Sequence, residues 1–314
     1  MNVDIIHNED CRVGLRKLPS DCIDCCVTSP PYLGLRDYGT DAQIGLESSP
    51  KEYVRHLKGV FRQVLRVLKP SGTLWLVIGD CYSGSPKGAA INPDNAKKWK
   101  QGTNRGTMAV RTHYKQFTGI PARNLIGIPW MVAFALRDLG FYLRQDIIWS
   151  KPNAMPESVK TRCVKSHEYI FLLTKSPVYY FDYEAIQTAS KKPNGGGKME
   201  GTHRAGREQR PFPTSNTGVG IATGEKANRR DVWEIPTRPA GGDHFATFPP
   251  ALVRDCILAG CPTDGIVLDP FMGSGTTAMV ARELNRHYIG YELNAEYCAQ
   301  ANRRISSTIQ DLFY

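Results

Sequence analysis

The stretch Ile266–Ala278, which reads Ile-Val-Leu-Asp-Pro-Phe-Met-Gly-Ser-Gly-Thr-Thr-Ala, constrains the fold more than any other part of the chain. An apolar run ends at an acid and is followed by a glycine turn and by helix-forming residues. This order is typical of a buried parallel strand that enters a Gly-x-Gly-x-x-Ala turn, where backbone N–H groups and a helix N-terminus face a ligand. A glycine turn alone also fits an ordinary tight connection between a strand and a helix.

The next segment repeats this plan and adds a second acid. A helix is predicted over about 276–285, and a strand is predicted at His287–Tyr291, directly before Glu292. Glu292 lies 19 positions after Gly273. An acid about 20 positions beyond such a turn is suited to bind ribose hydroxyls. The pair of units therefore favours an α/β fold with a nucleoside-binding edge.

Composition predicts a soluble, cytoplasmic protein. With 314 residues and 41% hydrophobic content, the chain can bury one large core or two modest ones. No apolar run approaches the roughly 20 residues that cross a bilayer, and the N-terminus lacks the basic and apolar regions of an export signal. Nine cysteines, an odd number, fit a reducing compartment. The Cys22-x-x-Cys25-Cys26 pattern lacks a second ligand pair, so we expect core cysteines and no metal.

The net charge of +10 is concentrated in two segments. Residues 83–118 hold seven Lys/Arg against one acid, and residues 190–230 hold nine against three, so each carries +6. Such segments attract a polyanion, nucleic acid most obviously, although lysine-rich loops also occur simply as solvated surface. The candidate DNA-binding residues in them are Lys97, Lys98, Lys100, Arg105, Lys191, Lys192, Arg204 and Arg207.

A second motif follows the predicted strand at 22–28, where the chain continues as Ser29-Pro30-Pro31-Tyr32. The two prolines remove backbone donors and hold the chain extended, which leaves carbonyls pointing outward beside an aromatic ring. This tetrapeptide resembles the catalytic motif of amino-methyltransferases, in which Asp, Asn or Ser is followed by Pro-Pro and an aromatic residue. Those enzymes methylate the exocyclic nitrogen of cytosine or adenine in DNA with S-adenosylmethionine. Asp269–Thr277 resembles their cofactor motif, so the two motifs together make the match specific.

The resemblance covers nearly the whole chain and implies its architecture. It implies a Rossmann-like fold with a mostly parallel seven-stranded sheet, helices on both faces and an antiparallel hairpin at the edge. The hairpin is predicted at Tyr169–Thr174 and Val178–Asp182, separated by Lys175-Ser-Pro177. A capping box at Ser49–Glu52 opens an amphipathic helix that Pro70–Gly72 would stop. The other predicted helices are 11–18 and 128–136. The other predicted strands are 3–6, 73–78, 144–149 and 232–235.

The catalytic motif precedes the cofactor motif, which resembles the circularly permuted β arrangement of the family. This order implies a catalytic half at 1–189, including a basic insertion at about 83–118. A target-recognition insertion would follow at 190–230, and a cofactor-binding half at 231–314. Phe245 stands where many relatives have proline. The β arrangement is compatible with a homodimer, and a restriction endonuclease partner is neither implied nor excluded.

The resemblance also implies the chemistry. An exocyclic amine is a poor nucleophile because its lone pair is delocalised into the ring. The Ser29 side chain and the Pro30 carbonyl would accept its two hydrogens, while Tyr32, next to Pro31, would stack on the flipped base of double-stranded DNA. Methyl transfer would be a direct displacement aided by proximity. Methylation of cytosine C5 would need a nucleophilic cysteine, usually after proline, and the chain has no Pro-Cys dipeptide.

Cofactor contacts carry over from the family position by position. Glu292 would bind the ribose, and Asp10 would receive the adenine amino group. The wall around methionine and ribose would come from the glycine turn, and the segment before Pro249 would close the methionine end. The residues around methionine and ribose would be Asp269, Pro270, Phe271, Gly273, Ser274, Gly275 and Thr276. The residues that close the methionine end would be Thr247 and Phe248.

Several functions stay open at this level. Serine at the head of the tetrapeptide favours cytosine N4, with adenine N6 as the alternative. Related Asn-Pro-Pro-Tyr enzymes that modify glutamine make a protein or RNA methyltransferase a further candidate, and an inert DNA-binding relative is another. His167-Glu168 suggests the zinc motif of metalloproteases, but Phe171 stands where the second histidine would be needed, so we interpret this pair as structural.

Overall fold

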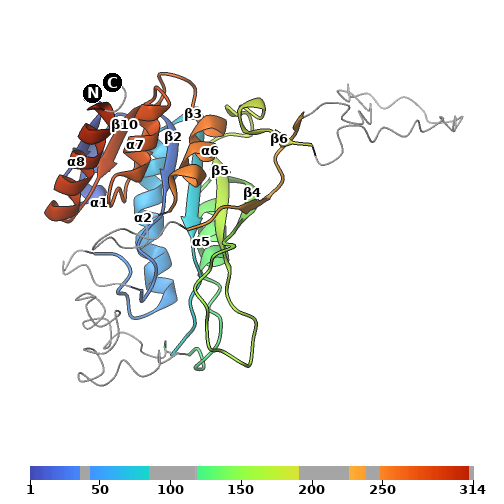
Figure 1. Cartoon of the computed structure of the whole chain (residues 1–314). Coiled ribbons are helices and arrows are strands. Elements are labelled where there is room, and N and C mark those ends of the chain that lie inside the picture. Colours follow the sequence, from blue (N-terminus) through green and yellow to red (C-terminus); the bar gives the residue numbers. More distant parts are fainter. Residues whose placement is uncertain (36–42, 85–116, 118, 191–225, 238–247, 311–314) are drawn as a thin grey trace, which may run out of the picture. The chain divides into compact units, whose positions relative to one another are not determined.

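The computed structural model describes residues 1–35, 43–84, 117, 119–190, 226–237 and 248–310 (Figure 1). The chain divides into two compact units. The larger comprises Met1–Asp182 and Asp231–Tyr314, and the smaller is Tyr183–Arg230. Within the described residues, no helix combines the length and the apolar character needed to cross a membrane.

The larger unit is built on one eight-stranded sheet, in which only β5 runs antiparallel to its neighbours. This confirms the mostly parallel Rossmann-like sheet and corrects the expected number of seven strands. The strand predicted at 232–235 is present as the short β8, which pairs parallel with β4 at the edge. The order across the sheet is β1 (Ile5–His7), β10 (His287–Tyr291), β9 (Ile266–Asp269), β2 (Ile23–Thr28), β3 (Leu68–Ile78), β5 (His167–Thr174), β4 (Tyr142–Ser150) and β8 (Val232–Glu234).

The expected hairpin within 169–182 is wrong. β5 finds its antiparallel partners in β3 and β4, so it lies inside the sheet, and 178–182 forms no strand. The backbone of 178–182 makes isolated hydrogen bonds in place of a strand ladder. Tyr180 N–H donates to the Ser71 carbonyl at 3.0 Å, and Asp182 N–H donates to the Ala259 carbonyl at 2.9 Å. The aromatic residues that suggested a strand make ring contacts instead: Phe181 stacks on Trp75 with centroids 6.3 Å apart, and Tyr179 meets Phe181 edge-on at 6.3 Å.

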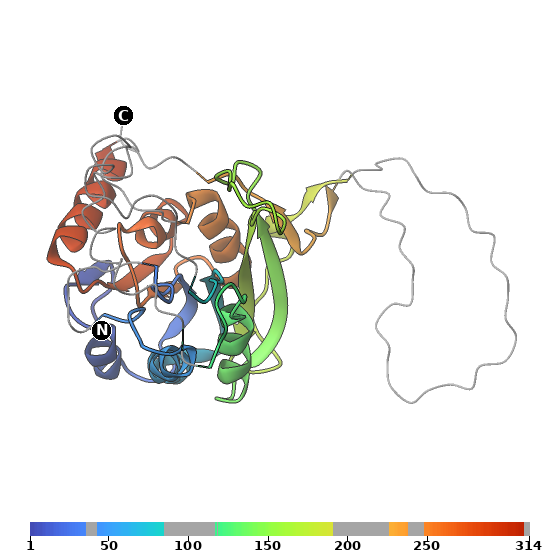
Figure 2. The same ribbon diagram turned by 90° about the horizontal axis from the view of Figure 1, so that it is seen from below.

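Helices cover both faces of the sheet. In Figure 2 the blue and green helices lie on one side of the strands, and the orange and red helices lie on the other. The first group is α1 (Cys11–Lys17), α2 (Pro50–Val67) and α5 (Ile128–Arg137), and the second is α6 (Pro250–Gly260), α7 (Thr276–Glu283) and α8 (Ala295–Gln310). α2 begins as predicted, with Ser49 Oγ accepting from Glu52 N–H at 3.2 Å. It ends at Val67, before Pro70, because β3 begins at Leu68.

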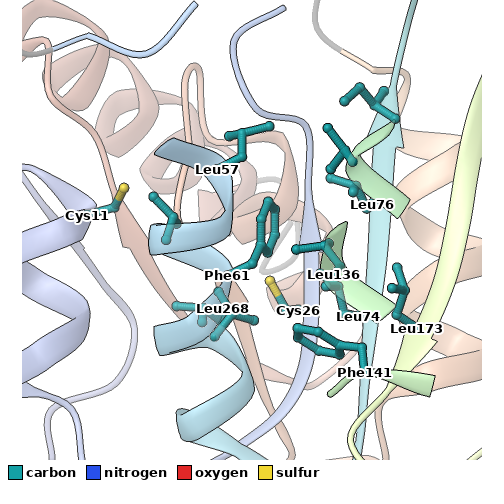
Figure 3. Packing of buried hydrophobic residues seen from close by; sticks show 14 of the residues in the cluster. Cys11, Cys26, Leu57, Phe61, Leu74, Leu76, Leu136, Phe141, Leu173 and Leu268 are labelled. Atoms are coloured by element: carbon teal, nitrogen blue, oxygen red, sulfur yellow. The ribbon is translucent and has the colours of Figure 1, made fainter. Parts of the chain in front are cut away.

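The core follows from the alternation along β3. Leu74, Leu76 and Ile78 belong to the cluster that includes Leu57 and Phe61 of α2. Figure 3 shows Leu74 and Leu76 of β3 facing Leu57 and Phe61. Full burial of an aliphatic or aromatic side chain contributes about 1.5–3 kcal/mol. On the opposite face, Trp75 and Thr73 pack on α6, and the Thr73 hydroxyl donates to the Gly260 carbonyl at 2.9 Å. A Cβ at Gly260 would lie 2.3 Å from Trp75 Nε1, so α6 approaches the sheet closely only because this residue is glycine.

The topology brings the two sequence motifs together. β2 pairs parallel with β9, with Cys26 opposite Leu268. Parallel strands end at the same edge of a sheet, so Ser29, after β2, and Pro270, after β9, both lie at that edge. Thr28 and Asp269, which are 241 positions apart in the chain, are joined there by a 2.6 Å hydrogen bond.

The smaller unit contains a 3-10 helix, η3 (Glu184–Ile186), and an antiparallel pair formed by β6 (Thr188–Ala189) and β7 (Lys226–Ala227). Residues 191–225 lie outside the described residues. The expected target-recognition insertion at 190–230 falls largely on this segment, and the unit itself begins earlier, at Tyr183.

Candidate active site

A cavity of about 300 Å³ opens at the edge where the parallel strands end, and both motifs line it. Most of the predicted site residues are brought together there. Asp269 and Gly275 are the exceptions among the described residues, because neither lines the cavity. Thr247 and the eight predicted DNA-binding residues lie outside the described residues. The predicted residues on the wall are Asp10, Ser29, Pro30, Pro31, Tyr32, Phe248, Pro270, Phe271, Gly273, Ser274, Thr276 and Glu292.

Asp269 supports the cavity from beneath. Its side chain is fully buried at the end of β9. One carboxylate oxygen accepts from the Thr28 hydroxyl at 2.6 Å and from Phe271 N–H at 3.0 Å, and the other accepts from the Thr277 hydroxyl at 2.7 Å. Burial raises the pKa of Asp269 to about 6, although these hydrogen bonds act in the opposite direction. Asp269 therefore holds β2, β9 and the start of α7 in register.

The glycine turn after β9 is shaped by two residues with left-handed backbone. Gly273 has φ +54° and Gly275 has φ +82°, and Gly275 is the N-cap of α7. A Cβ at Gly275 would lie 2.8 Å from the Ala301 Cβ, so this glycine serves the packing of α8. Arg304 of α8 donates to the Ser274 carbonyl at 2.6 Å and to its hydroxyl at 2.7 Å. The turn is therefore fixed before any ligand arrives.

Glu292 closes the turn from the next strand. One carboxylate oxygen accepts from Gly273 N–H at 2.8 Å, and the other accepts from Asn294 N–H at 2.7 Å. Burial raises the pKa of Glu292, partly offset by these backbone hydrogen bonds. Each oxygen retains a further acceptor position, because a carboxylate has about four lone-pair sites.

Asp10 begins α1 on the same wall. Its carboxylate accepts from Arg12 N–H at 2.8 Å as the N-cap and also binds the Arg12 guanidinium through two nitrogens. Burial opposes ionisation of Asp10, but the hydrogen bonds and the charge of Arg12 outweigh it and lower the pKa. Asp10 therefore presents an ionised acceptor to the cavity.

The tetrapeptide Ser29–Tyr32 is held from two sides. The Tyr53 hydroxyl, from the buried face of α2, donates to the Pro31 carbonyl at 2.8 Å. The Tyr32 hydroxyl lies 2.7 Å from a Glu168 carboxylate oxygen and 3.4 Å from Ser29 Oγ. Burial, followed by the Glu168 charge, raises the pKa of Tyr32 well above its usual value, so the phenol is neutral. The tetrapeptide is thus a fixed wall of the cavity.

Three residues that the sequence did not single out as functional complete this wall. Glu168, at the start of β5, forms an ion pair with Lys151, and the Lys151 ammonium lies 4.2 Å from the centre of the Trp149 ring. The sequence analysis interpreted His167-Glu168 as structural because Phe171 stands where a zinc motif would need its second histidine. An antiparallel β5 places its first residues at the edge where β3 ends. Other wall residues that were not predicted include Glu9, Arg12, Gln43, Met272, Tyr291, Asn294, Tyr297 and Gln300.

The residues around the glycine turn suit an adenosyl group. Asp10 and Glu292, two carboxylates that can accept from an amine or a hydroxyl, line the same cavity as Gly273 and Ser274. Thr276 lines the same cavity, and its buried hydroxyl has no hydrogen-bond partner among the described residues. A buried hydroxyl without a partner is rare, so a ligand that binds it is the natural explanation.

Comparisons with known proteins give the family. The model for N6/N4-type DNA methylases matches residues 23–303. The chain is 46% identical over 291 residues to the Type II methyltransferase M.Cfr9I of Citrobacter freundii, covering 93% of this chain and 84% of that protein. It is 45% identical over 299 residues to the Type II methyltransferase M.SmaI of Serratia marcescens, covering 94% and 88%.

Solved structures show the same fold at lower identity. The PvuII DNA methyltransferase, described as cytosine-N4-specific, superposes with a TM-score of 0.62 at 19% identity, covering 96% of this chain and 90% of that one. A DNA modification methylase of Thermus thermophilus, solved with S-adenosyl-L-methionine, gives a TM-score of 0.57 at 22% identity, covering 97% and 95%. The chain belongs to the N6/N4 family of DNA amino-methyltransferases, whose methyl donor is S-adenosyl-L-methionine.

Proposed function

We propose that this methyltransferase modifies the N4 amine of cytosine in double-stranded DNA, on a base flipped into the cavity. The observation that carries the proposal is Ser29, a neutral hydroxyl at the head of the tetrapeptide and on the cavity wall. In the family that the chain belongs to, serine at this position goes mainly with cytosine N4.

The surroundings of Ser29 support a neutral group there. Ser29 Oγ lies 3.4 Å from the Tyr32 hydroxyl, and that hydroxyl is bonded to the Glu168 carboxylate. An aspartate at position 29 would bring a second negative charge close to Glu168 inside a partly dry cavity, and like charges repel more strongly where water is excluded. Serine accepts a hydrogen bond at this point without that repulsion.

Catalysis then consists of orienting the amine and stabilising it as it changes shape. Bound S-adenosylmethionine supplies an activated methyl group on a positively charged sulfur. Ser29 Oγ and the Pro30 carbonyl accept the two amine hydrogens, so the nitrogen lone pair leaves conjugation with the ring and turns toward the methyl carbon. The bound donor would supply a direct displacement, in which the C–S bond is exchanged for a C–N bond, and the methylated amine would release one proton to solvent. The Tyr53 hydrogen bond to the Pro31 carbonyl keeps the two acceptors in place.

Binding of the duplex is assigned to the basic segments. Residues 83–118 and 190–230 each carry +6, and we assign phosphate contacts to the eight lysines and arginines named above and target recognition to 190–230. Flipping of the target base into the cavity costs a few kcal/mol of unstacking, which contacts to the duplex and to the flipped base must offset.

Mass spectrometry of the product tests the proposal. The enzyme is incubated with S-adenosylmethionine carrying a CD3 group and with genomic DNA amplified in vitro, which is free of methylation. The DNA is digested to nucleosides, with the Ser29→Ala variant as the control. We expect CD3 on N4 of deoxycytidine. Labelled N6-methyldeoxyadenosine as the main product contradicts the cytosine assignment, and label only in added RNA or protein contradicts the DNA substrate.

A further inference from the structure

Glu168 lies against the catalytic tetrapeptide, although it belongs to neither sequence motif. Its carboxylate contacts the Tyr32 hydroxyl at 2.7 Å and the Lys151 ammonium, and both Glu168 and Lys151 line the cavity. We propose that Glu168 is a positioning residue, which sets the direction of the tetrapeptide hydrogen bonds so that Ser29 presents its lone pairs to the target amine. This inference rests on amine methylation as proposed above, and it holds for either base.

The direction follows from counting hydroxyl protons. An ionised carboxylate can only accept, so the single Tyr32 proton is donated to Glu168. The Tyr32 oxygen can then only accept in its contact with Ser29 Oγ, which is 3.4 Å away. The Ser29 proton is therefore directed at Tyr32, and the Ser29 lone pairs are left for the amine hydrogens. A hydroxyl that rotates freely would spend part of its time pointing its proton at the amine, which is a donor itself.

Neighbouring residues fix Glu168 in this arrangement. The Lys151 ammonium holds one carboxylate oxygen, and each of the two side chains is only 17% exposed. Gly79, at the end of β3, gives room for the contact, because a Cβ there would lie 2.7 Å from the Tyr32 ring and 3.3 Å from the Glu168 carboxyl carbon. Lys165 donates to the Asp80 carbonyl beside them. The group is thus built from the ends of β3, β4 and β5, which are rigid elements.

A simpler role for Glu168 is to support the Tyr32 ring as a stacking surface. That role depends on the ring, whereas the proposed role depends on the hydroxyl. Tyr32→Phe removes the hydroxyl and keeps the ring, so it separates the two. If Glu168 acts through the hydroxyl, a change at Glu168 has no further effect once Tyr32 is phenylalanine.

The test is a double-mutant cycle with Glu168→Gln, Tyr32→Phe and the combined variant. Methyl transfer is measured in a single turnover with saturating S-adenosylmethionine and unmethylated amplified DNA, and cofactor affinity is measured by calorimetry. In Glu168→Gln the amide can donate to Tyr32, whose proton then turns to Ser29. We expect the transfer rate to fall by about tenfold or more, with cofactor affinity within about twofold. The double variant should match Tyr32→Phe alone.

Glu234→Gln is the matched control, because Glu234 is exposed on β8 and lies outside the cavity wall. Its transfer rate should equal that of the wild type. A Glu168→Gln rate equal to the wild type, or effects of the two single changes that multiply in the double variant, would overturn the proposal. If Glu168→Gln does not fold, as judged by circular dichroism, Glu168→Met removes the acceptor instead, and the same cycle applies. Wild-type enzyme that labels no DNA base at all refutes the proposed function rather than this inference.

Discussion

The Glu292 carboxylate, at the end of β10, accepts a 2.8 Å hydrogen bond from the backbone N–H of Gly273, in the turn after β9. β9 and β10 are parallel neighbours, with Asp269 opposite Gly290, so the acid and the turn meet at one sheet edge. One strand–turn–helix–strand unit therefore explains why Glu292 lies 19 positions after Gly273. The acid also fixes the glycine turn before the cofactor binds, which reduces the ordering cost of binding.

Glu292→Gln should weaken S-adenosylmethionine binding by about tenfold or more, because a hydrogen bond to a charged group is worth roughly 1.5–3 kcal/mol. Calorimetry of the purified variants measures this. Burial raises the pKa of Glu292, so wild-type affinity should fall as the pH is lowered and should start to fall at a higher pH than for an ordinary glutamate. Glu296→Gln, an exposed position at the start of α8, is the control and should bind normally. Equal affinities for Glu292→Gln and the control would remove Glu292 from the cofactor site.

Gly79→Ala should slow methyl transfer strongly and leave cofactor affinity nearly unchanged. The added Cβ would lie 2.7 Å from the Tyr32 ring, so the ring and its hydroxyl must move away from Glu168. Gly59→Ala is a matched control, since a Cβ there meets nothing within 4 Å in the middle of α2. That control should raise the free energy of unfolding by about 0.5–1 kcal/mol without changing the rate. A Gly79→Ala enzyme with a normal single-turnover rate would show that the Tyr32 position is not critical.

Asp269→Asn should change how stability depends on pH. The folded protein holds the Asp269 proton up to a pKa of about 6, while the unfolded chain loses it near 3.8. Between these values the native state binds more protons, so wild-type stability falls as the pH rises, an effect absent in the asparagine variant. The stability of the variant relative to the wild type should therefore increase by up to about 3 kcal/mol from pH 4 to pH 7. Urea unfolding at several pH values checks this, and a difference that is constant with pH would contradict it.

Local patterns predicted the parts of the molecule that local physics determines. The glycine turn at 273–275, the N-cap at Ser49 and the strand before Glu292 were all predicted and confirmed. The structure also brings Ser29 to the same cavity wall as the glycine turn, because β2 and β9 are parallel and end at one edge. These features depend on residues close in sequence or on a general rule of α/β sheets.

Features set by distant packing were not predictable from the sequence. The 178–182 segment has the residue types of a strand, but Phe181 packs on Trp75, and the backbone of the segment donates to isolated carbonyls of Ser71 and Ala259. Glu168 became part of the site only because β5 inserts antiparallel between β3 and β4. Asp269 was predicted to contact the cofactor; the structure shows its carboxylate bound to three protein donors and places it outside the cavity wall, so the contact stays a prediction.

Neutralising Lys191, Lys192, Arg204 and Arg207 together should weaken DNA binding and reduce its dependence on salt. Each lost phosphate contact lowers the slope of log K against log salt by about 0.9. Fluorescence anisotropy with a labelled duplex at several salt concentrations measures the slope. Lys17→Gln, on an exposed residue of α1, serves as the control. An unchanged slope in the fourfold variant would mean that these residues are solvated surface.

The most direct test of the account is the single-turnover rate of methyl transfer by Ser29→Ala, measured together with its affinity for S-adenosylmethionine and for DNA. Ser29 Oγ acts mainly as the amine pyramidalises, so its loss should cost transition-state stabilisation and little ground-state binding. We predict a rate lower by about 10²–10³, comparable to the loss of one oxyanion-hole donor, with both affinities within about twofold. A variant that transfers methyl groups at the wild-type rate would contradict the account and leave the Pro30 carbonyl as the acceptor of the amine.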